Sequence, residues 1–214
     1  QSGPAWSDVA VLYRTNSQSL AFEESMRRKG IPYRIYRGSS FYDHKEIKDM
    51  LGYLRLIINP RDDEAFKRIV NYPARGIGDT TVQRTEVLAR SRGVSMWEAV
   101  DSLVAETALS PAADAVTKAI VRKVTEFVKL INDLSLARAD RNIYEFGMEV
   151  ASRSGILGTL RGENTPDAQS AVDNNEELLN SMQDFKEQRD AEIRNGEREE
   201  NEEATVEEWL QSVM

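Results

Sequence analysis

Apolar residues recur at helical spacing along most of the chain, which predicts a mainly α-helical protein. The clearest stripe, within residues 44–58, places Ile47, Met50, Leu51, Leu54 and Ile58 on one helix face. The same spacing predicts further helices at 17–29, 64–72, 80–92, 94–106, 112–139, 143–155, 167–195 and 206–214. Between them, residues 157–166 are expected to be a polar loop, and residues 196–204 (GEREENEEA) a disordered acidic linker.

Two short segments near the N-terminus show the alternation of β-strands instead. Residues 8–14 read DVAVLYR and residues 31–36 read IPYRIY, both rich in β-branched and aromatic side chains. With the helix between them they form a strand–helix–strand unit of about 38 residues, which is too small to bury its own core. We therefore expect residues 1–38 to be a piece of a larger α/β domain whose open strand edge favours homodimers.

Several helix starts carry capping residues. Asp43 with Glu46 forms the capping-box pattern D-x-x-E, and Asn142 and Thr205 precede the helices that follow them. Pro111 takes the first-turn position that proline tolerates, at the start of the helix predicted from residue 112.

The segment from 71 to 81, NYPARGIGDTT, is predicted to be a tight hairpin between two helices. Pro73 ends the helix before it, because a residue that precedes proline is driven out of the helical region. Gly76 and Gly78 can take positive φ and leave backbone amides uncovered. Ile77 between them can anchor the hairpin from below.

This hairpin has the features of an anion site. Asp79 is a suitable N-cap for the next helix. Exposed amides beside a helix N-terminus bind anions, most often phosphate, and Arg75 adds a charge that can pair with one. The same residues also fit a simple turn that binds nothing.

Charge is unevenly distributed along the chain. The formal net charge is −8, yet residues 27–100 carry 15 Lys and Arg against 9 Asp and Glu, a net of +6. The rest of the chain carries a net of −14. A phosphate-binding face beside an acidic tail gives this asymmetry, and so does a mixed solvated surface.

Composition and motifs argue against several classes of protein. The chain has no cysteine and one histidine, His44, which argues against disulfides, cysteine zinc sites, histidine-rich metal sites and a Ser-His-Asp triad. No phosphate-binding P-loop, dinucleotide fingerprint, signal peptide or membrane span is present. Adjacent carboxylates such as Asp62 and Asp63 fit helix caps. We assign no catalytic residue, metal or cofactor to this chain, whose composition fits a cytoplasmic protein.

A second candidate contact lies at residues 13–19, YRTNSQS, where a predicted strand ends and a helix begins. Arg14, Asn16 and Ser17 are residue types that contact phosphate and sugar. Asn16 or Ser17 can equally cap the helix without a ligand.

Taken together, these segments resemble the superfamily 1 DNA helicases of the UvrD/PcrA/Rep type. The matching stretches, dense from 9 to 97, read YRTNSQS, GIPYRIYRG, KEIKD, YLRLI and RGIGDTT, in order and with matched gaps. A later N-x-E-E-L segment from Asn174, followed by Phe185, is similar to one near the end of the same subdomain. The resemblance implies that residues 1–38 belong to the RecA-like subdomain 2A, residues 39–195 to the helical, DNA-binding subdomain 2B, and residues 196–214 to the return toward 2A.

The resemblance also implies DNA contacts. Arg14 and Asn16 would touch single-stranded DNA, whereas Leu20 stands where the family often has an arginine. The hairpin would hold duplex backbone without reading sequence, with site residues Arg75, Gly76, Ile77, Gly78, Thr80 and Thr81. Lys45 and Lys48 are further candidates for the same face.

The remaining expectations concern the larger protein. ATP with Mg²⁺ would drive 3′→5′ translocation there, but the nucleotide-binding motifs are not in this chain, so it should not hydrolyse ATP alone. The resemblance implies a role in DNA repair or replication at the bacterial nucleoid, with repair proteins or RNA polymerase as possible partners and no membrane. The alternative from a different class is a protein-interaction module that uses the acidic helices from Asp167 onward.

Overall fold

A computed structural model describes residues 5–14, 16–36, 40–109, 114–199 and 201–213. These residues form three short 3₁₀ turns and the α-helices α1 Asn16–Arg28, α2 Lys45–Ile58, α3 Asp63–Ile69, α4 Asp79–Arg92, α5 Met96–Leu109, α6 Ala115–Ala137, α7 Ile143–Arg153, α8 Ile156–Gly162, α9 Pro166–Arg194 and α10 Val206–Val213. The mainly helical fold is therefore confirmed. No helix among the described residues is long and apolar enough to cross a membrane.

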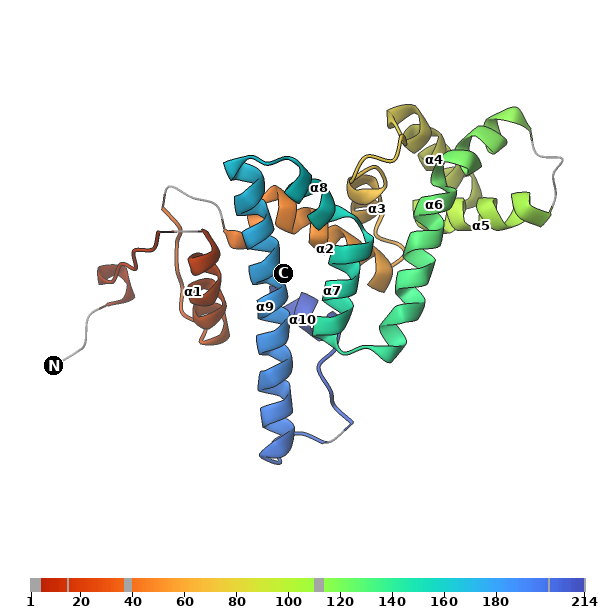
Figure 1. Cartoon of the computed structure of the whole chain (residues 1–214). Helices are drawn as coiled ribbons and strands as arrows, with labels where there is room; N and C mark the ends of the chain where they lie inside the picture. Colours follow the sequence, from red (N-terminus) through yellow and green to blue (C-terminus); the bar gives the residue numbers. More distant parts are fainter. Residues whose placement is uncertain (1–4, 15, 37–39, 110–113, 200, 214) are drawn as a thin grey trace.

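The molecule is elongated, with α2 and α9 at its centre (Figure 1). Helix α2 packs on α3, α7, α9 and α10, and α7 and α8 pack along α9. Helices α4, α5 and α6 form one end, while α1 and the N-terminal segment form the other (Figure 1).

The predicted apolar stripe of α2 forms the middle of the core. Ile47, Met50 and Leu54 are fully buried there. Beside them, the ring of Phe127 on α6 packs edge-on against Phe66 of α3 and Trp97 of α5, with ring centroids 5.8 and 6.2 Å apart. These contacts join α5 and α6 to α3, which packs in turn on α2.

The two N-terminal strands predicted from the sequence are not formed among the described residues. Residues 9–13 and 31–35 have no regular secondary structure and no strand ladder. Their side chains are mostly solvent-exposed, including Leu12 at 95% and Tyr36 at 84% of full exposure. A strand needs a hydrogen-bonded neighbour, and the described residues supply none, so local propensity is not enough.

The prediction of a polar loop at 157–166 is also wrong. Residues 156–162 form α8, because Ile156, Leu157 and Leu160 share one face that is buried in the core. Gly158 and Gly162 made this short amphipathic helix hard to predict, because two glycines in seven residues are typical of a loop. Residues 196–199 and 201–204 form neither helix nor strand.

Helix caps follow the predictions in part. Asn142 and Glu145 form a reciprocal capping box at α7, and the Thr205 hydroxyl accepts the Glu208 amide at 3.2 Å. Asp43 does not cap α2, because it lies in a 3₁₀ turn and its carboxylate takes Lys48 Nζ at 2.7 Å instead. Pro111 lies outside the described residues.

Candidate nucleic-acid interface

The predicted hairpin connects α3 to α4 and is built around the side chain of Asn71. Asn71 Oδ1 accepts the backbone amides of Arg75 at 2.8 Å and Ile77 at 3.0 Å. Gly76, between these two residues, has φ +70°, which favours glycine. The loop therefore closes on one side-chain oxygen.

Four other amides of this segment have no acceptor in the described part of the chain. Among the described residues, the N–H groups of Gly76, Gly78, Asp79 and Thr80 make no hydrogen bond within the chain. Gly76 and Gly78 are exposed, and a Cβ on either would meet nothing within 4 Å. The donors of Gly78, Asp79 and Thr80 lie at the N-terminus of the 14-residue α4, where the helix dipole favours an anion, and that of Gly76 lies in the turn just before it.

Gly78, rather than the predicted Asp79, is the N-cap of α4. Its carbonyl accepts the amides of Thr81 at 2.8 Å and Val82 at 3.2 Å, so Asp79 is already the first helical residue. Glycine is among the residues found at N-caps, and here no described side chain accepts an amide of the first helical turn.

Ile77 anchors the hairpin as expected and is only 2% exposed. Arg75 also points inward. Its guanidinium donates to the carbonyls of Ile69 at 3.2 Å, Pro73 at 3.1 Å and Ser154 at 2.9 Å, and to the Tyr53 hydroxyl at 2.6 Å.

Two aromatic rings complete the surroundings of this guanidinium. Its central carbon lies 5.8 Å from the centroid of Tyr53 and 5.6 Å from that of Phe127, within cation–π range. Burial raises the pKa of Tyr53 to about 12, although the adjacent Arg75 charge opposes this shift. The Tyr53 hydroxyl donates in turn to the Tyr72 carbonyl at 2.6 Å. The phosphate contact expected of Arg75 stays a prediction, and the observed bonds support the loop from inside.

The two threonines after the hairpin differ. Thr80 is exposed and lines an open groove of about 620 Å³ between α4 and α6, together with Gln83 and Arg84. Thr81 is buried. Of this pair, Thr80 is the accessible candidate for a phosphate contact.

The two candidate lysines of α2 lie in different places. Lys45 Nζ lies 4.3 Å from the ring centroid of Tyr72, at the base of the hairpin, and 3.3 Å from Asp49 Oδ2. Lys48 is paired with Asp43 and lines a separate groove between α2 and α3. Lys45 therefore adjoins the candidate interface, whereas Lys48 faces a different groove.

Arg14 and Asn16 lie at the opposite end of the molecule, beside α1 (Figure 1). Arg14 is exposed, and its amide donates to Gln18 Oε1 at 2.9 Å. Asn16 is the first residue of α1, and its side chain lies outside the described part. The structure therefore does not bring Arg14 and Asn16 close to the predicted contact in the hairpin (Figure 1).

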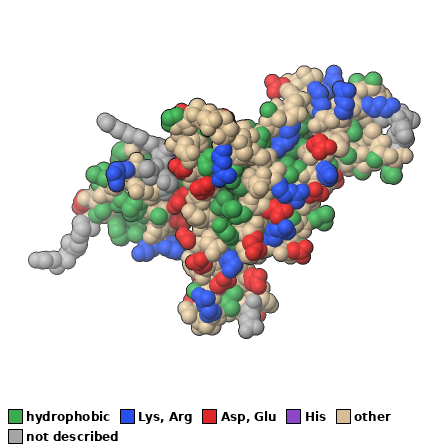
Figure 2. Space-filling model, viewed as in Figure 1, with side chains coloured by type: hydrophobic (Ala, Val, Ile, Leu, Met, Phe, Trp, Pro, Cys, Tyr) green, Lys and Arg blue, Asp and Glu red, His purple; other side chains and the backbone are tan. Residues whose placement is uncertain are grey.

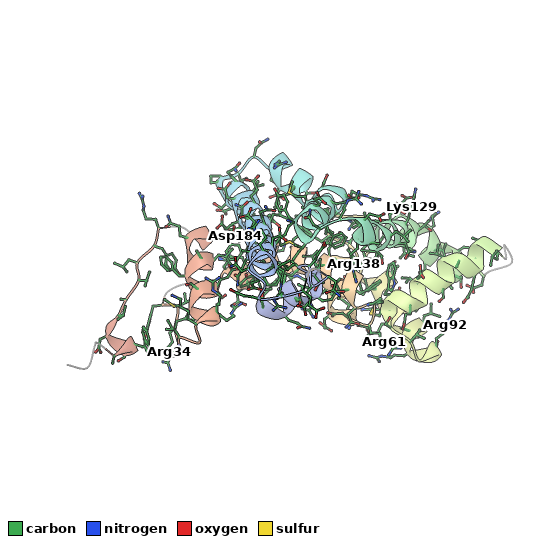
Figure 3. All side chains as sticks on the ribbon, turned by 90° about the horizontal axis from the view of Figure 1, so that it is seen from below. Arg34, Arg61, Arg92, Lys129, Arg138 and Asp184 are labelled. Atoms are coloured by element: carbon green, nitrogen blue, oxygen red, sulfur yellow. The ribbon has the colours of Figure 1, made fainter. Side chains whose placement is uncertain are left out.

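Basic side chains gather at the α4–α6 end (Figure 2). Arg61 and Arg92 lie on one side of this end and Lys129 on the other, far from Arg34 in the N-terminal segment (Figure 3). Among the described residues, Arg84 and Lys129 have no ion-pair partner, whereas Arg92 is paired with Glu106 at 2.9 Å. The described residues contain no cluster of three metal-ligating side chains.

Asn71 is the site residue that the sequence reasoning missed. An asparagine just after a helix and before a glycine-rich turn commonly bonds nearby backbone amides. Asn71 stands four and six residues before the two amides that it accepts, and its position in the sequence could have indicated this role.

Comparison with known proteins shows the family of this chain. A family model described as the UvrD-like helicase C-terminal domain matches residues 1–212. DNA helicase II of Haemophilus influenzae is 40% identical over 86% of this chain, and DNA helicase II of Escherichia coli is 37% identical over 86%. The ATP-dependent DNA helicase PcrA of Staphylococcus aureus is 34% identical over 87%. The chain covers 24%, 25% and 24% of these three proteins. The chain therefore belongs to the UvrD-like helicase C-terminal domain family.

Proposed function

We propose that this chain is the duplex-binding and regulatory part of an ATP-dependent DNA helicase and that it holds DNA backbone through the hairpin at 75–78. The observation that carries the proposal is that four exposed residues before and at the start of α4 have backbone amides with no acceptor among the described residues. The family membership supports DNA as the source of the phosphate.

The chemistry of this contact is simple. Amide donors and a helix N-terminus bind phosphate oxygens but cannot distinguish one base pair from another, so binding is independent of sequence. Each Lys or Arg that neutralises a phosphate releases counterions, and affinity therefore falls with salt. Arg84 and Lys45 are near enough to the hairpin and α4 to add such contacts.

The parent protein's activity is part of the same proposal. ATP and Mg²⁺, bound by segments that this chain does not contain, would drive 3′→5′ translocation during DNA repair or replication in the cytoplasm. Arg14 and Asn16 would contact the single strand, and the hairpin would orient the duplex ahead of it.

Fluorescence anisotropy with a blunt duplex, a single strand and a 3′-tailed duplex tests the proposal. We expect the two duplex-containing DNAs to bind preferentially at low salt and to be released as salt rises. No binding of any DNA at low salt would overturn the proposal for this chain and favour the protein-interaction alternative, in which the acidic surface of α9 meets a basic partner.

A matched pair of variants at Asp79 isolates the amide contact. Asp79→Pro removes one free N–H, and proline suits this position because it is the first of α4 and follows Gly78 at φ −82°, ψ 172°. Asp79→Ala removes the same carboxylate but keeps the N–H. Because a hydrogen bond to a charged group contributes about 1.5–3 kcal/mol, Asp79→Pro should bind duplex about tenfold more weakly than Asp79→Ala.

A further inference from the structure

We infer that Asn71 is a positioning residue that sets which hairpin amides are available to phosphate. Its Oδ1 takes the amides of residues 75 and 77, and the amides of Gly76 and Gly78 are thereby left for a ligand. The inference rests on the proposed function, because it names how that same site is organised.

The alternation along the loop has a clear physical basis. A carbonyl oxygen has two lone pairs, and both are used here by amides two residues apart. The two residues whose amides Asn71 accepts, Arg75 and Ile77, also direct their side chains into the interior. The residues between and after them, Gly76 and Gly78, carry no side chain that would cover their amides.

Asn71 can be replaced without disturbing the packing of the core. It is exposed, it follows the last residues of α3, and its two hydrogen bonds go only to the hairpin. Arg75, by contrast, bonds to carbonyls of three segments, so its removal disturbs packing as well as the loop. Replacing Asn71 therefore changes the orientation of the loop amides without opening the core.

The chain supplies a matched control at Asn59. This residue is exposed, lies in the loop between α2 and α3, and accepts the backbone amide of Arg61 on its Oδ1 at 3.1 Å. Asn59→Ala thus removes the same kind of bond from a loop outside the hairpin.

The experiment combines amide hydrogen exchange by NMR with titration of a short blunt duplex at low salt. In the wild type, the amides of residues 75 and 77 should be protected, while those of Gly76 and Gly78 exchange fast and shift on adding DNA. In Asn71→Ala, protection at 75 and 77 should be lost and duplex affinity should fall about tenfold, the loss expected for one misdirected bond to phosphate. Asn71→Asp, which keeps the acceptor, should restore the protection, and Asn59→Ala should leave both readouts unchanged.

The outcomes separate this inference from the proposed function. If Asn71→Ala loses protection at 75 and 77 but binds duplex as well as the wild type, or keeps that protection, the inference is overturned and the proposed function stands. If the wild type binds no duplex, the proposed function fails, and the inference fails with it.

Discussion

Replacement of Arg75 distinguishes an internal support from a phosphate contact. The guanidinium makes four hydrogen bonds, to the carbonyls of Ile69, Pro73 and Ser154 and to the hydroxyl of Tyr53. Alanine would remove all four bonds from a partly buried region, and among the described residues only the Ile69 carbonyl would keep another donor, the amide of Tyr72 at 3.0 Å. The expected effect is therefore on folding stability first and on DNA binding second.

The magnitude follows from the number and kind of bonds. Hydrogen bonds to a charged group contribute about 1.5–3 kcal/mol each, but bonds that share one side chain are not additive. A total of about 3 kcal/mol for Arg75→Ala corresponds to a melting temperature lower by about 6–12 °C in a protein of this size. Lysine should recover only part of this, because its ammonium group has three donors on a single atom and cannot span the same four acceptors.

Thermal denaturation followed by circular dichroism measures the effect, with Arg84→Ala as the matched control. Arg84 is exposed on α4 and has no ion-pair partner among the described residues, so its removal takes away the same charge without the internal bonds. Its melting temperature should stay within about 2 °C of the wild type, as for most surface substitutions.

Two results would refute this reasoning. One is an Arg75→Ala variant that melts with the wild type. The other is an Arg75→Lys variant of full stability. A true phosphate contact would instead leave stability unchanged and lower the salt dependence of duplex binding by about one unit of slope.

Three further predictions concern stability, measured by urea denaturation. Gly147→Ala should destabilise the protein by about 1–3 kcal/mol, because a Cβ there would lie 2.6 Å from Met182 Sδ on α9. Burial raises the pKa of Tyr53 to about 12, so the neutral phenol favours the folded state; stability should be full below about pH 10 and fall as pH rises toward 12, less steeply in Tyr53→Phe. Asn142→Ala should cost about 1 kcal/mol by removing the α7 capping box, whereas Asp43→Ala, which removes no helix cap, should cost less than about 0.5 kcal/mol.

The helices were predictable because periodicity and burial coincide in them. The stripe read in α2 is the stripe that the core buries, and the interruption at Asn59 and Pro60 does separate α2 from α3. The short α8 was missed because two glycines in seven residues resemble a loop, and its stability comes from packing against α7 and α9.

The N-terminal strands show the opposite limit. Their alternation is real, but a strand exists only as a pair, and sequence shows the side-chain pattern without the partner. Because no described residues pair with these segments or cover them, the side chains of Val9, Leu12 and Tyr36 are exposed. The domain boundaries expected at residues 38 and 196 stay predictions.

For the hairpin, sequence identified the residue types but not their directions. An arginine beside two glycines suits a phosphate, yet the same planar group also suits three carbonyls and a hydroxyl, and only the packing of α2, α6 and α7 decides between them. Here the cation supports the loop from inside, and the neutral amides of Gly76 and Gly78 are the groups left exposed. Affinity for DNA should therefore depend on the shape of this turn at least as much as on its charge, which is why the acceptor on Asn71 is the more informative position to change.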